Sequence, residues 1–189
     1  MKIGFAMCGS FCTFSQVFPI MELLAKEHTI TPIFSEAVCS TDSRFGTAQS
    51  NWQQAAEICG TDPLHTIAQV EPIGPKKLLD ALIIAPCTGN TLAKLAHSIA
   101  DGPVTMAAKS HLRNGRPILV AVSTNDALAG AAENIGKLLA RKHYYFVPFG
   151  QDDAGKKPTS MVADFKKIPQ ALEAALEGRQ VQPILLVCR

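Results

Sequence analysis

Short apolar runs alternate along the chain with longer stretches in which apolar residues recur at helical spacing. The short runs are predicted to be strands, because consecutive apolar and β-branched residues suit a strand that is buried on both faces of a sheet. Five such strands are predicted over residues 2–7, 29–34, 81–85, 117–122 and 144–147. Weaker runs predict a short strand over residues 65–68 and a last strand or extended tail over residues 183–187.

Between these runs, apolar residues recur every three or four positions, which predicts amphipathic helices. The first helix is predicted over residues 13–26, where Pro19 indicates a bend or a late start. Residues 36–50 are polar and are predicted to be irregular. Further helical segments are predicted over residues 51–59, 75–79, 91–100, 104–112, 128–141 and 168–176.

This alternation predicts an α/β fold, with a parallel sheet and helices on both of its faces in three α/β/α layers. The length favours a single domain over residues 1–189. Right-handed crossovers place the carboxyl ends of parallel strands at one edge, where ligands bind in such sheets. Four loops rich in Ser, Thr, Asn, Gly or Asp follow the strands, at residues 8–13, 35–46, 86–91 and 123–130. Together they predict one polar ligand site.

The loop over residues 86–91 is the most informative of the four. It joins a buried strand to a helix start, where unpaired backbone N–H groups and the positive end of the helix dipole attract anions such as phosphate. Thr88, Asn90 and Thr91 have side chains that suit a polar ligand. The plainer alternative is that Thr88 or Asn90 only caps the helix.

The loop after the first strand lacks the usual nucleotide-binding fingerprints. Its glycines are not spaced as G-x-G-x-x-G, and no G-x-x-x-x-G-K-[ST] segment occurs in the chain. The sequence therefore disfavours a P-loop and the standard dinucleotide site. Gly9 and Ser10 still offer a flexible backbone and a hydroxyl directly before a helix, which suits a monophosphate. An ordinary turn capped by Ser10 or Thr13 is the alternative.

Composition and charge narrow the function classes. Hydrophobic residues make up 47% of the chain and charged residues 18%, which supports a sizeable core. The formal net charge is +2 with no basic block, which argues against a nucleic-acid partner. No apolar run reaches the roughly 18–20 residues that cross a membrane, and the first apolar run is too short for a signal peptide. We therefore expect a cytoplasmic protein without a membrane partner.

Six cysteines form neither a zinc pattern nor a disulfide framework. Cys8 and Cys12 are four residues apart, but no second pair or nearby His completes a metal site. We therefore expect free thiols and no bound metal. Cys8 and Cys87 follow predicted strands, so they are the two thiols with a candidate chemical role. The remaining cysteines are Cys12, Cys39, Cys59 and Cys188.

These motifs resemble those of the flavoprotein superfamily that includes phosphopantothenoylcysteine decarboxylase, the peptidyl-cysteine decarboxylases and the prenyl-flavin transferases. The shared features are Gly9-Ser10 after the first strand, Ser35 at the end of the second, and residues 86–102. The last segment is similar to the superfamily's P-A-[ST]-x-N-T-[LI]-[AG]-K-x-x-x-G-[IL]-A-D. The resemblance covers nearly the whole chain and implies a Rossmann-like, flavodoxin-like fold that binds FMN.

Site residues follow from this resemblance position by position. Gly9, Ser10 and Ser35 are expected to hold the phosphate or the ribityl chain of FMN. The loop before the next helix is expected to line the same site, and a later loop is expected to face the flavin or the substrate. The residues of these two loops are Pro86, Thr88, Asn90 and Thr91, and then Ser123 and Asn125. A nicotinamide nucleotide or phosphate alone is the alternative ligand.

Residues 35–46 and 150–158 resemble one branch of the superfamily more narrowly, the dipicolinate synthases of spore-forming Firmicutes. That resemblance implies oxidation of a cyclic dihydro- or tetrahydro-dipicolinate precursor to pyridine-2,6-dicarboxylate, together with the A subunit of the same enzyme, in the mother-cell cytoplasm. It also implies a homo-oligomer. Arg44 is the candidate to bind the dicarboxylate, with a solvated surface arginine as the alternative.

Two other functions stay open at the level of sequence. A flavin-dependent decarboxylase or prenyl-flavin-type transferase is the first. It is disfavoured because residues 123–127 depart from the decarboxylases' P-A-M-N motif, and because His65 is only roughly placed for their histidine. The second is a non-catalytic, nucleotide-binding partner chain, since no obvious acid–base pair is visible in the sequence.

Overall fold

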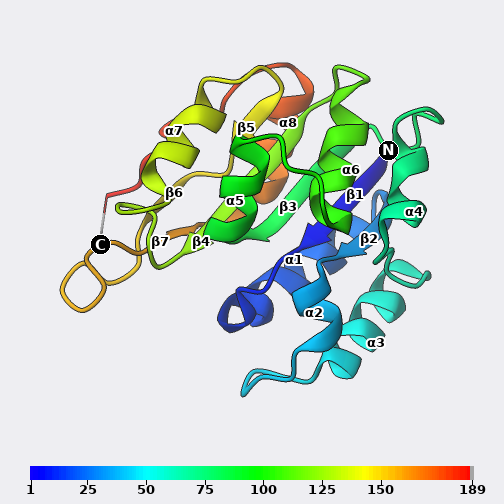
Figure 1. The fold of residues 1–189 in the computed structure, drawn as a ribbon, viewed down its shortest axis with the longest axis horizontal. Coiled ribbons are helices and arrows are strands. Elements are labelled where there is room, and N and C mark those ends of the chain that lie inside the picture. The colour runs from blue at the N-terminus through cyan, green and yellow to red at the C-terminus, as the bar shows by residue number, and fades with distance from the viewer. Residues whose placement is uncertain (188–189) are drawn as a thin grey trace.

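The computed structural model describes residues 1–187 and contains a seven-stranded sheet (Figure 1). The strands run in the order β2-β1-β3-β4-β7-β6, with β5 also paired to β4. Their bounds are β1 (Lys2–Met7), β2 (Thr29–Phe34), β3 (Ala81–Cys87), β4 (Ile118–Thr124), β5 (Tyr144–Phe146), β6 (Phe149–Gln151) and β7 (Met161–Ala163).

The central part of the sheet is parallel, as the sequence pattern predicts. β1 pairs in parallel with β2 and β3, β3 with β4, and β4 with β5. All seven residues of β3 are buried, because helices cover the sheet on both sides. The α/β class with a mostly parallel, helix-flanked sheet is thereby confirmed, and the carboxyl ends of β1 to β4 lie at one edge.

Helices form a layer on each face of the sheet. α5 (Gly89–Ala96), α6 (Pro103–Leu112) and α7 (Ala132–Leu139) pack together on one face, next to α4 (Ile67–Val70). α1 (Phe14–Ala25) and α8 (Ile168–Leu176) cover the other face (Figure 1). α3 (Ala48–Cys59) packs beside α1 and β2, and α2 (Glu36–Ser40) beside α3. Short 3-10 turns, Phe11–Thr13, Glu71–Ile73 and Phe165–Lys167, connect these elements.

Several local predictions are wrong, and capping accounts for two of them. Residues 36–50 are irregular only over residues 41–47, since α2 follows Ser35 and α3 begins at Ala48 behind the capping box of Thr47 and Ser50. Residues 65–68 do not form a strand. A second capping box, from Thr66 to Gln69, begins α4 there, and only Leu64 makes a bridge to β2.

Other differences concern where elements end. α1 continues through Pro19, which is exposed on the outer side of the helix. The helical turn predicted over residues 75–79 corresponds to a turn over residues 74–77 that follows Ile73. α5 stops at Ala96 and α7 begins only at Ala132, so both are shorter than predicted. β3 runs past Ala85 to Cys87.

The strands β6 and β7, of three residues each, were not predicted from the sequence. They are antiparallel to one another, and β7 extends the sheet by pairing with Ser123 and Thr124 at the end of β4. The predicted last strand is a single bridge between Phe149 and Leu185, and Cys188 and Arg189 lie outside the described residues. Within the described residues, no helix has the length and apolar character that a membrane span requires.

Candidate functional site

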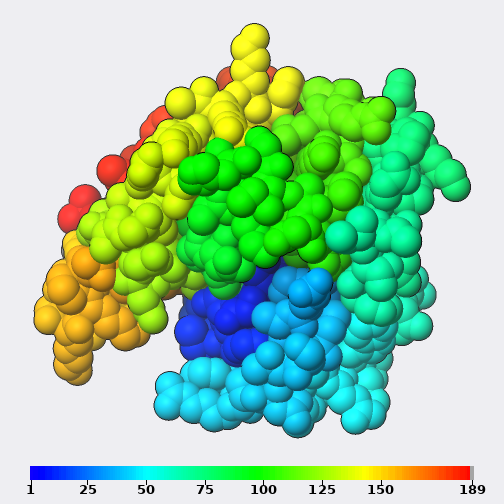
Figure 2. Space-filling model, in the orientation of Figure 1, coloured from blue at the N-terminus to red at the C-terminus, as the bar shows by residue number. Residues whose placement is uncertain are grey.

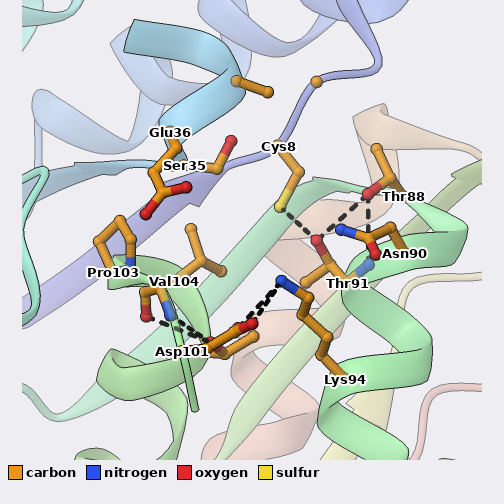
Figure 3. A pocket seen from close by; sticks show the side chains of 14 residues that line it. Cys8, Ser35, Glu36, Thr88, Asn90, Thr91, Lys94, Asp101, Pro103 and Val104 are labelled. Atoms are coloured by element: carbon orange, nitrogen blue, oxygen red, sulfur yellow. Dashed lines mark hydrogen bonds and ion pairs between the residues drawn. The ribbon is translucent and has the colours of Figure 1, made fainter. Parts of the chain in front are cut away.

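The loops that follow β1, β2, β3 and β4 surround two neighbouring cavities at the carboxyl edge of the sheet. The first cavity, of about 420 Å³, lies between the loops after β1, β2 and β3 and the N-terminal ends of α5 and α6 (Figure 3). The second cavity, of about 370 Å³, lies between the loop after β1, residues 43–45 and the β6–β7 segment. Gly9 and Thr88 line both. Each volume falls in the range of small-molecule sites, roughly 300–1,000 Å³.

Hydroxyl groups line the first cavity at the start of α5. Thr88 caps the helix, with its Oγ1 3.4 Å from the Thr91 backbone nitrogen and 3.1 Å from the Thr91 hydroxyl (Figure 3). The Thr91 hydroxyl donates in turn to the Cys8 sulfur at 3.3 Å. The first amides of a helix have no partner within it, and the cap satisfies only the third. Asn90, the second residue of the helix, lines the first cavity, so its amide remains for a ligand.

Ser35 contributes the most informative atom of the first cavity. Its Oγ is buried and has no hydrogen-bond partner among the described residues. A buried hydroxyl without a partner is costly, so such an atom indicates a missing partner. A phosphate or sugar oxygen in the first cavity would supply that partner.

Charged side chains line the other wall of the first cavity. Lys94 on α5 makes an ion pair with Asp101, at 2.9 Å to each carboxylate oxygen, and so links α5 to the loop before α6 (Figure 3). Glu36, at the start of α2, lines the cavity opposite them. Because Asp101 neutralises Lys94, the helix N-termini at the starts of α5 and α6 are the groups of the first cavity that attract an anion.

The two candidate thiols are poor nucleophiles. Burial raises the pKa of Cys8 to about 11, and the hydrogen bond from Thr91 offsets only part of this effect. Burial also raises the pKa of Cys87 well above its ordinary value. Both thiols are therefore protonated at neutral pH, whereas thiolate is the reactive form. The geometry makes Cys8 a hydrogen-bond acceptor at the base of the first cavity rather than a reactive group.

The second cavity is lined by hydroxyl, amide and aromatic side chains, and cations lie at two places on its wall. The hydroxyls of Ser10 and Ser123 lie 2.7 Å apart on its wall. The guanidinium of Arg44 lies 4.7 Å from the centre of the Phe45 ring. Lys157 makes an ion pair with Asp152 at 3.2 Å. The arrangement suits an anionic ligand that also has an apolar ring.

The structure distributes the predicted site residues over the two cavities. Ser35, Asn90 and Thr91 line the first cavity, and Ser10, Arg44, Ser123 and Asn125 the second. Gly9 and Thr88 line both, as described above. Pro86 lines neither; it is buried in β3, and its carbonyl accepts a hydrogen bond from the Cys8 amide at 3.2 Å.

The sequence analysis missed several lining residues. Asp152, Lys157 and Ser160 reach the second cavity because the antiparallel β6 and β7 hold them beside β4. The only signal for them was the polar run after residue 149. Glu36 and the start of α6 were missed in the first cavity, because no local pattern shows which helix ends meet. Among the described residues, no three His, Cys, Asp or Glu side chains are grouped to hold a metal ion.

His65 lies outside both cavities. Its ring packs edge-on against Trp52, with 5.1 Å between the ring centres, and its Nδ1 is 3.4 Å from the Pro63 carbonyl. Trp52 also packs on Phe34 and donates to Asp62 at 3.0 Å. The histidine therefore belongs to an aromatic cluster between α3 and the segment that follows it.

A helix-flanked parallel sheet with a phosphate-compatible cavity at its carboxyl edge is the architecture of a nucleotide- or flavin-binding protein. The sequence profile of the Flavoprotein family matches residues 1–167, and the chain belongs to this family.

The chain is also similar to individual proteins of known sequence and structure. The chain is 44% identical over 186 residues to the B subunit of dipicolinate synthase from Bacillus subtilis (strain 168), and the match covers 98% of this chain and 93% of that protein. The crystal structure of the B subunit of dipicolinate synthase from Bacillus halodurans superposes with a TM-score of 0.91 at 42% identity, covering 100% of this chain and 97% of the other. The FMN-dependent cysteine decarboxylase SpaF shares the fold, with a TM-score of 0.69, 20% identity and coverage of 94% and 95%.

Proposed function

We propose that this chain is the flavin-carrying B subunit of a two-subunit oxidoreductase that forms pyridine-2,6-dicarboxylate from a cyclic dihydro- or tetrahydro-dipicolinate precursor. The observation that carries the proposal is the unpartnered, buried Oγ of Ser35, which lines the same cavity as Asn90 at the start of α5. Similarity to the B subunit of dipicolinate synthase over nearly the whole chain supports the choice of reaction.

The first cavity offers the groups that the phosphate and ribityl chain of FMN require. The amide of Asn90 would bind a phosphate oxygen with the help of the α5 dipole. Ser35 and Thr88 would hydrogen-bond the ribityl hydroxyls or the phosphate. When bound, FMN supplies a redox-active ring that accepts hydride from the substrate. The role of the chain is to hold that ring in place and to exclude water from it.

The second cavity would bind the substrate. A dicarboxylate needs cationic or amide partners for its charges, and Arg44 is a cation there that no described carboxylate neutralises. Because Gly9 and Thr88 line both cavities, a ligand in the second would lie next to a flavin in the first. These two residues would therefore hold the substrate beside the cofactor.

The geometry favours oxidation over decarboxylation of a cysteinyl substrate. The one histidine that the sequence offered for the decarboxylase reaction, His65, packs against Trp52 outside both cavities. Cys8 and Cys87 are held as neutral thiols in the core. The residues that do line the second cavity suit an anion instead.

The proposed reaction also names the partners of the chain. The relative's designation as a B subunit implies an A subunit, and we propose that the corresponding chain binds this protein. We further propose a homo-oligomer, in the mother-cell cytoplasm of a spore-forming bacterium. Assays of each of the two chains alone and of the mixture test this assignment. Dehydrogenation by the A subunit without this chain, at the rate of the mixture, would reduce this chain to a non-catalytic partner.

The cofactor is tested by the absorption spectrum and by titration. Purified protein that retains FMN shows bands at roughly 370 and 450 nm, whereas a reduced nicotinamide absorbs at roughly 340 nm. We expect Ser35→Ala to weaken FMN binding about tenfold, the effect of one hydrogen bond. The free energy of unfolding should not fall, because the variant removes a hydroxyl that has no partner in the free protein.

Ser40→Ala is the matched control, because Ser40 lies on the same helix and its hydroxyl donates to the Glu36 carbonyl outside the cavity wall. FMN should bind this variant as it binds the wild type. Wild-type affinity for FMN in Ser35→Ala, or no flavin bands and no binding in the wild type, would refute the proposed cofactor site.

A further inference from the structure

The second cavity has two cationic lining residues on separate segments, Arg44 and Lys157. Arg44 belongs to the polar segment after α2, and Lys157 to the connection between β6 and β7. In Figure 2 the light-blue atoms of the segment after α2 lie below the blue atoms that follow β1, and the orange atoms of the β6–β7 connection lie to their left. The cavity therefore has a positive group at each of two walls.

Arg44 is held in place without a carboxylate partner. Ser43 and Gly46 exchange two backbone hydrogen bonds, of 3.0 and 3.1 Å, which close the turn that carries it. The side chain of Asp42 accepts from the Ala48 amide at 2.9 Å and fixes the turn to the start of α3. The Arg44 guanidinium rests on the Phe45 ring, so its donors stay directed to solvent or to a ligand.

Lys157 is also on an anchored segment, but its charge has a partner. The Lys157 amide donates to the Asp153 carbonyl at 2.7 Å, and the Thr159 hydroxyl donates to the Asn125 carbonyl at 2.6 Å. The ammonium group pairs with Asp152 at 3.2 Å, and 56% of the Lys157 side chain is exposed. An exposed ion pair of this kind contributes little to stability, so exchanging its partner costs little.

Asp152 remains satisfied when Lys157 leaves it. Although partial burial raises the pKa of the Asp152 carboxyl, hydrogen bonds from the buried Ser160 and from Lys157 lower it more. Ser160 continues to donate to this carboxylate when the ammonium group moves. Asp152 therefore serves as a resting partner for Lys157, and no buried charge is left alone after the exchange.

We propose that the second cavity binds an aromatic dicarboxylate by its two ends, one carboxylate on Arg44 and the other on Lys157, which exchanges Asp152 for the ligand. The inference rests on the proposed function and deepens it, because it assigns the substrate-discriminating residues. Two separated cations select a ligand with two carboxylates over a ligand with one, since each charge-assisted hydrogen bond adds to binding.

The experiment measures binding of pyridine-2,6-dicarboxylate and of pyridine-2-carboxylate to the FMN-loaded protein by calorimetry. We expect Lys157→Met to weaken dicarboxylate binding at least tenfold, the effect of one charged contact. Monocarboxylate binding should change twofold or less, because one carboxylate still binds at Arg44. Arg44→Met should also weaken dicarboxylate binding at least tenfold and change monocarboxylate binding twofold or less, because one carboxylate still binds at Lys157. Lys157→Gln is a second, polar variant, and circular dichroism checks the fold of each.

Lys156→Met is the matched control, because Lys156 is the exposed neighbour of Lys157 and does not line the second cavity. It should bind both ligands as the wild type does. The inference is overturned if Lys157→Met and Lys157→Gln leave dicarboxylate binding unchanged, or if they weaken both ligands equally. It is also overturned if flavin-loaded wild type binds no dicarboxylate.

Failure of the proposed function gives a different result. A wild type that takes up no FMN but binds the dicarboxylate in a Lys157-dependent manner refutes the flavin assignment and supports the dicarboxylate site. A wild type that binds FMN but binds the dicarboxylate no more tightly than the monocarboxylate supports the flavin assignment and refutes the dicarboxylate site.

Discussion

The side-chain oxygens of Ser10 and Ser123 lie 2.7 Å apart, although the two residues are 113 positions apart in the chain. This hydrogen bond joins the loop after β1 to the end of β4 at the wall of the second cavity. Ser123 is 4% exposed, so the bond is shielded from water on one side. We expect Ser10→Ala and Ser123→Ala each to lower the free energy of unfolding by about 1 kcal/mol.

The double variant tests whether the bond itself is responsible. Because each single substitution removes the same interaction, the double variant should lose about 1 kcal/mol less than the sum of the two. Urea denaturation of the four proteins gives the comparison. Strict additivity would contradict a direct bond between the two hydroxyls.

Asn90 gives a sharp test of the α5 start. It lies at the second position of the helix, it is exposed, and it lines the first cavity. We expect Asn90→Leu to abolish flavin retention, because a bulky apolar side chain beside the open amide blocks a phosphate. The folded state should persist, since little of Asn90 is buried. Gln16→Leu, on the exposed side of α1, is the control; equal flavin content in both variants would contradict the proposed contact.

Thiol reactivity follows from burial. At pH 8 we expect iodoacetamide to label Cys12, which is exposed, while Cys8 and Cys87 stay unmodified in the folded protein. The raised pKa of Cys8, about 11, keeps it a thiol at this pH, and burial denies access to the reagent. Mass spectrometry of peptides checks the result, and labelling in urea should reach Cys8 and Cys87 as well. Labelling of Cys8 as fast as Cys12 would contradict the structure.

The buried side chain of His111 should make the stability of the fold sensitive to acid. Its ring is fully buried in α6, with Nε2 3.1 Å from the Pro117 carbonyl and Nδ1 without a partner among the described residues. Burial lowers the pKa of His111 from 6.5 to about 4. A base whose folded pKa is depressed stabilises the fold above the unfolded pKa, and this stability is lost as pH falls towards the folded pKa.

Titration of His111 should therefore lower the free energy of unfolding by about 3 kcal/mol between pH 6.5 and pH 4. Below pH 4 the contribution of His111 should stay constant. In His111→Gln, whose amide nitrogen replaces Nε2 as the donor, this part of the decline should vanish. His97→Gln, at an exposed position, should retain the wild-type profile. Denaturant titrations at several pH values make the comparison, and an unchanged profile in His111→Gln would rule out this origin.

Much of the fold follows from the local pattern of the chain. β1, β2 and α8 begin and end at the predicted residues, and Gly60 ends α3 in the left-handed conformation that glycine permits (φ 66°). Strand runs that are apolar throughout imply cover on both faces, so the parallel sheet and its ligand edge were also predictable. Hydrophobic periodicity is a local property of the sequence. It is sufficient to predict a helix or strand wherever that element buries one face of its own side chains.

Tertiary structure determined the features that hydrophobic periodicity does not encode, namely the short strands β6 and β7 and the grouping of the site residues. β6 and β7 have three residues each; β7 pairs with Ser123 and Thr124 at the end of β4, and β6 pairs in turn with β7. The same pairing brings Lys157 to the second cavity and divides the predicted site residues between two spaces. Hydroxyl and amide side chains could be assigned to the carboxyl edge from sequence, because strand direction fixes which loops lie there. Which of them share a cavity depends on contacts between segments far apart in the chain, and only the packed structure determines those.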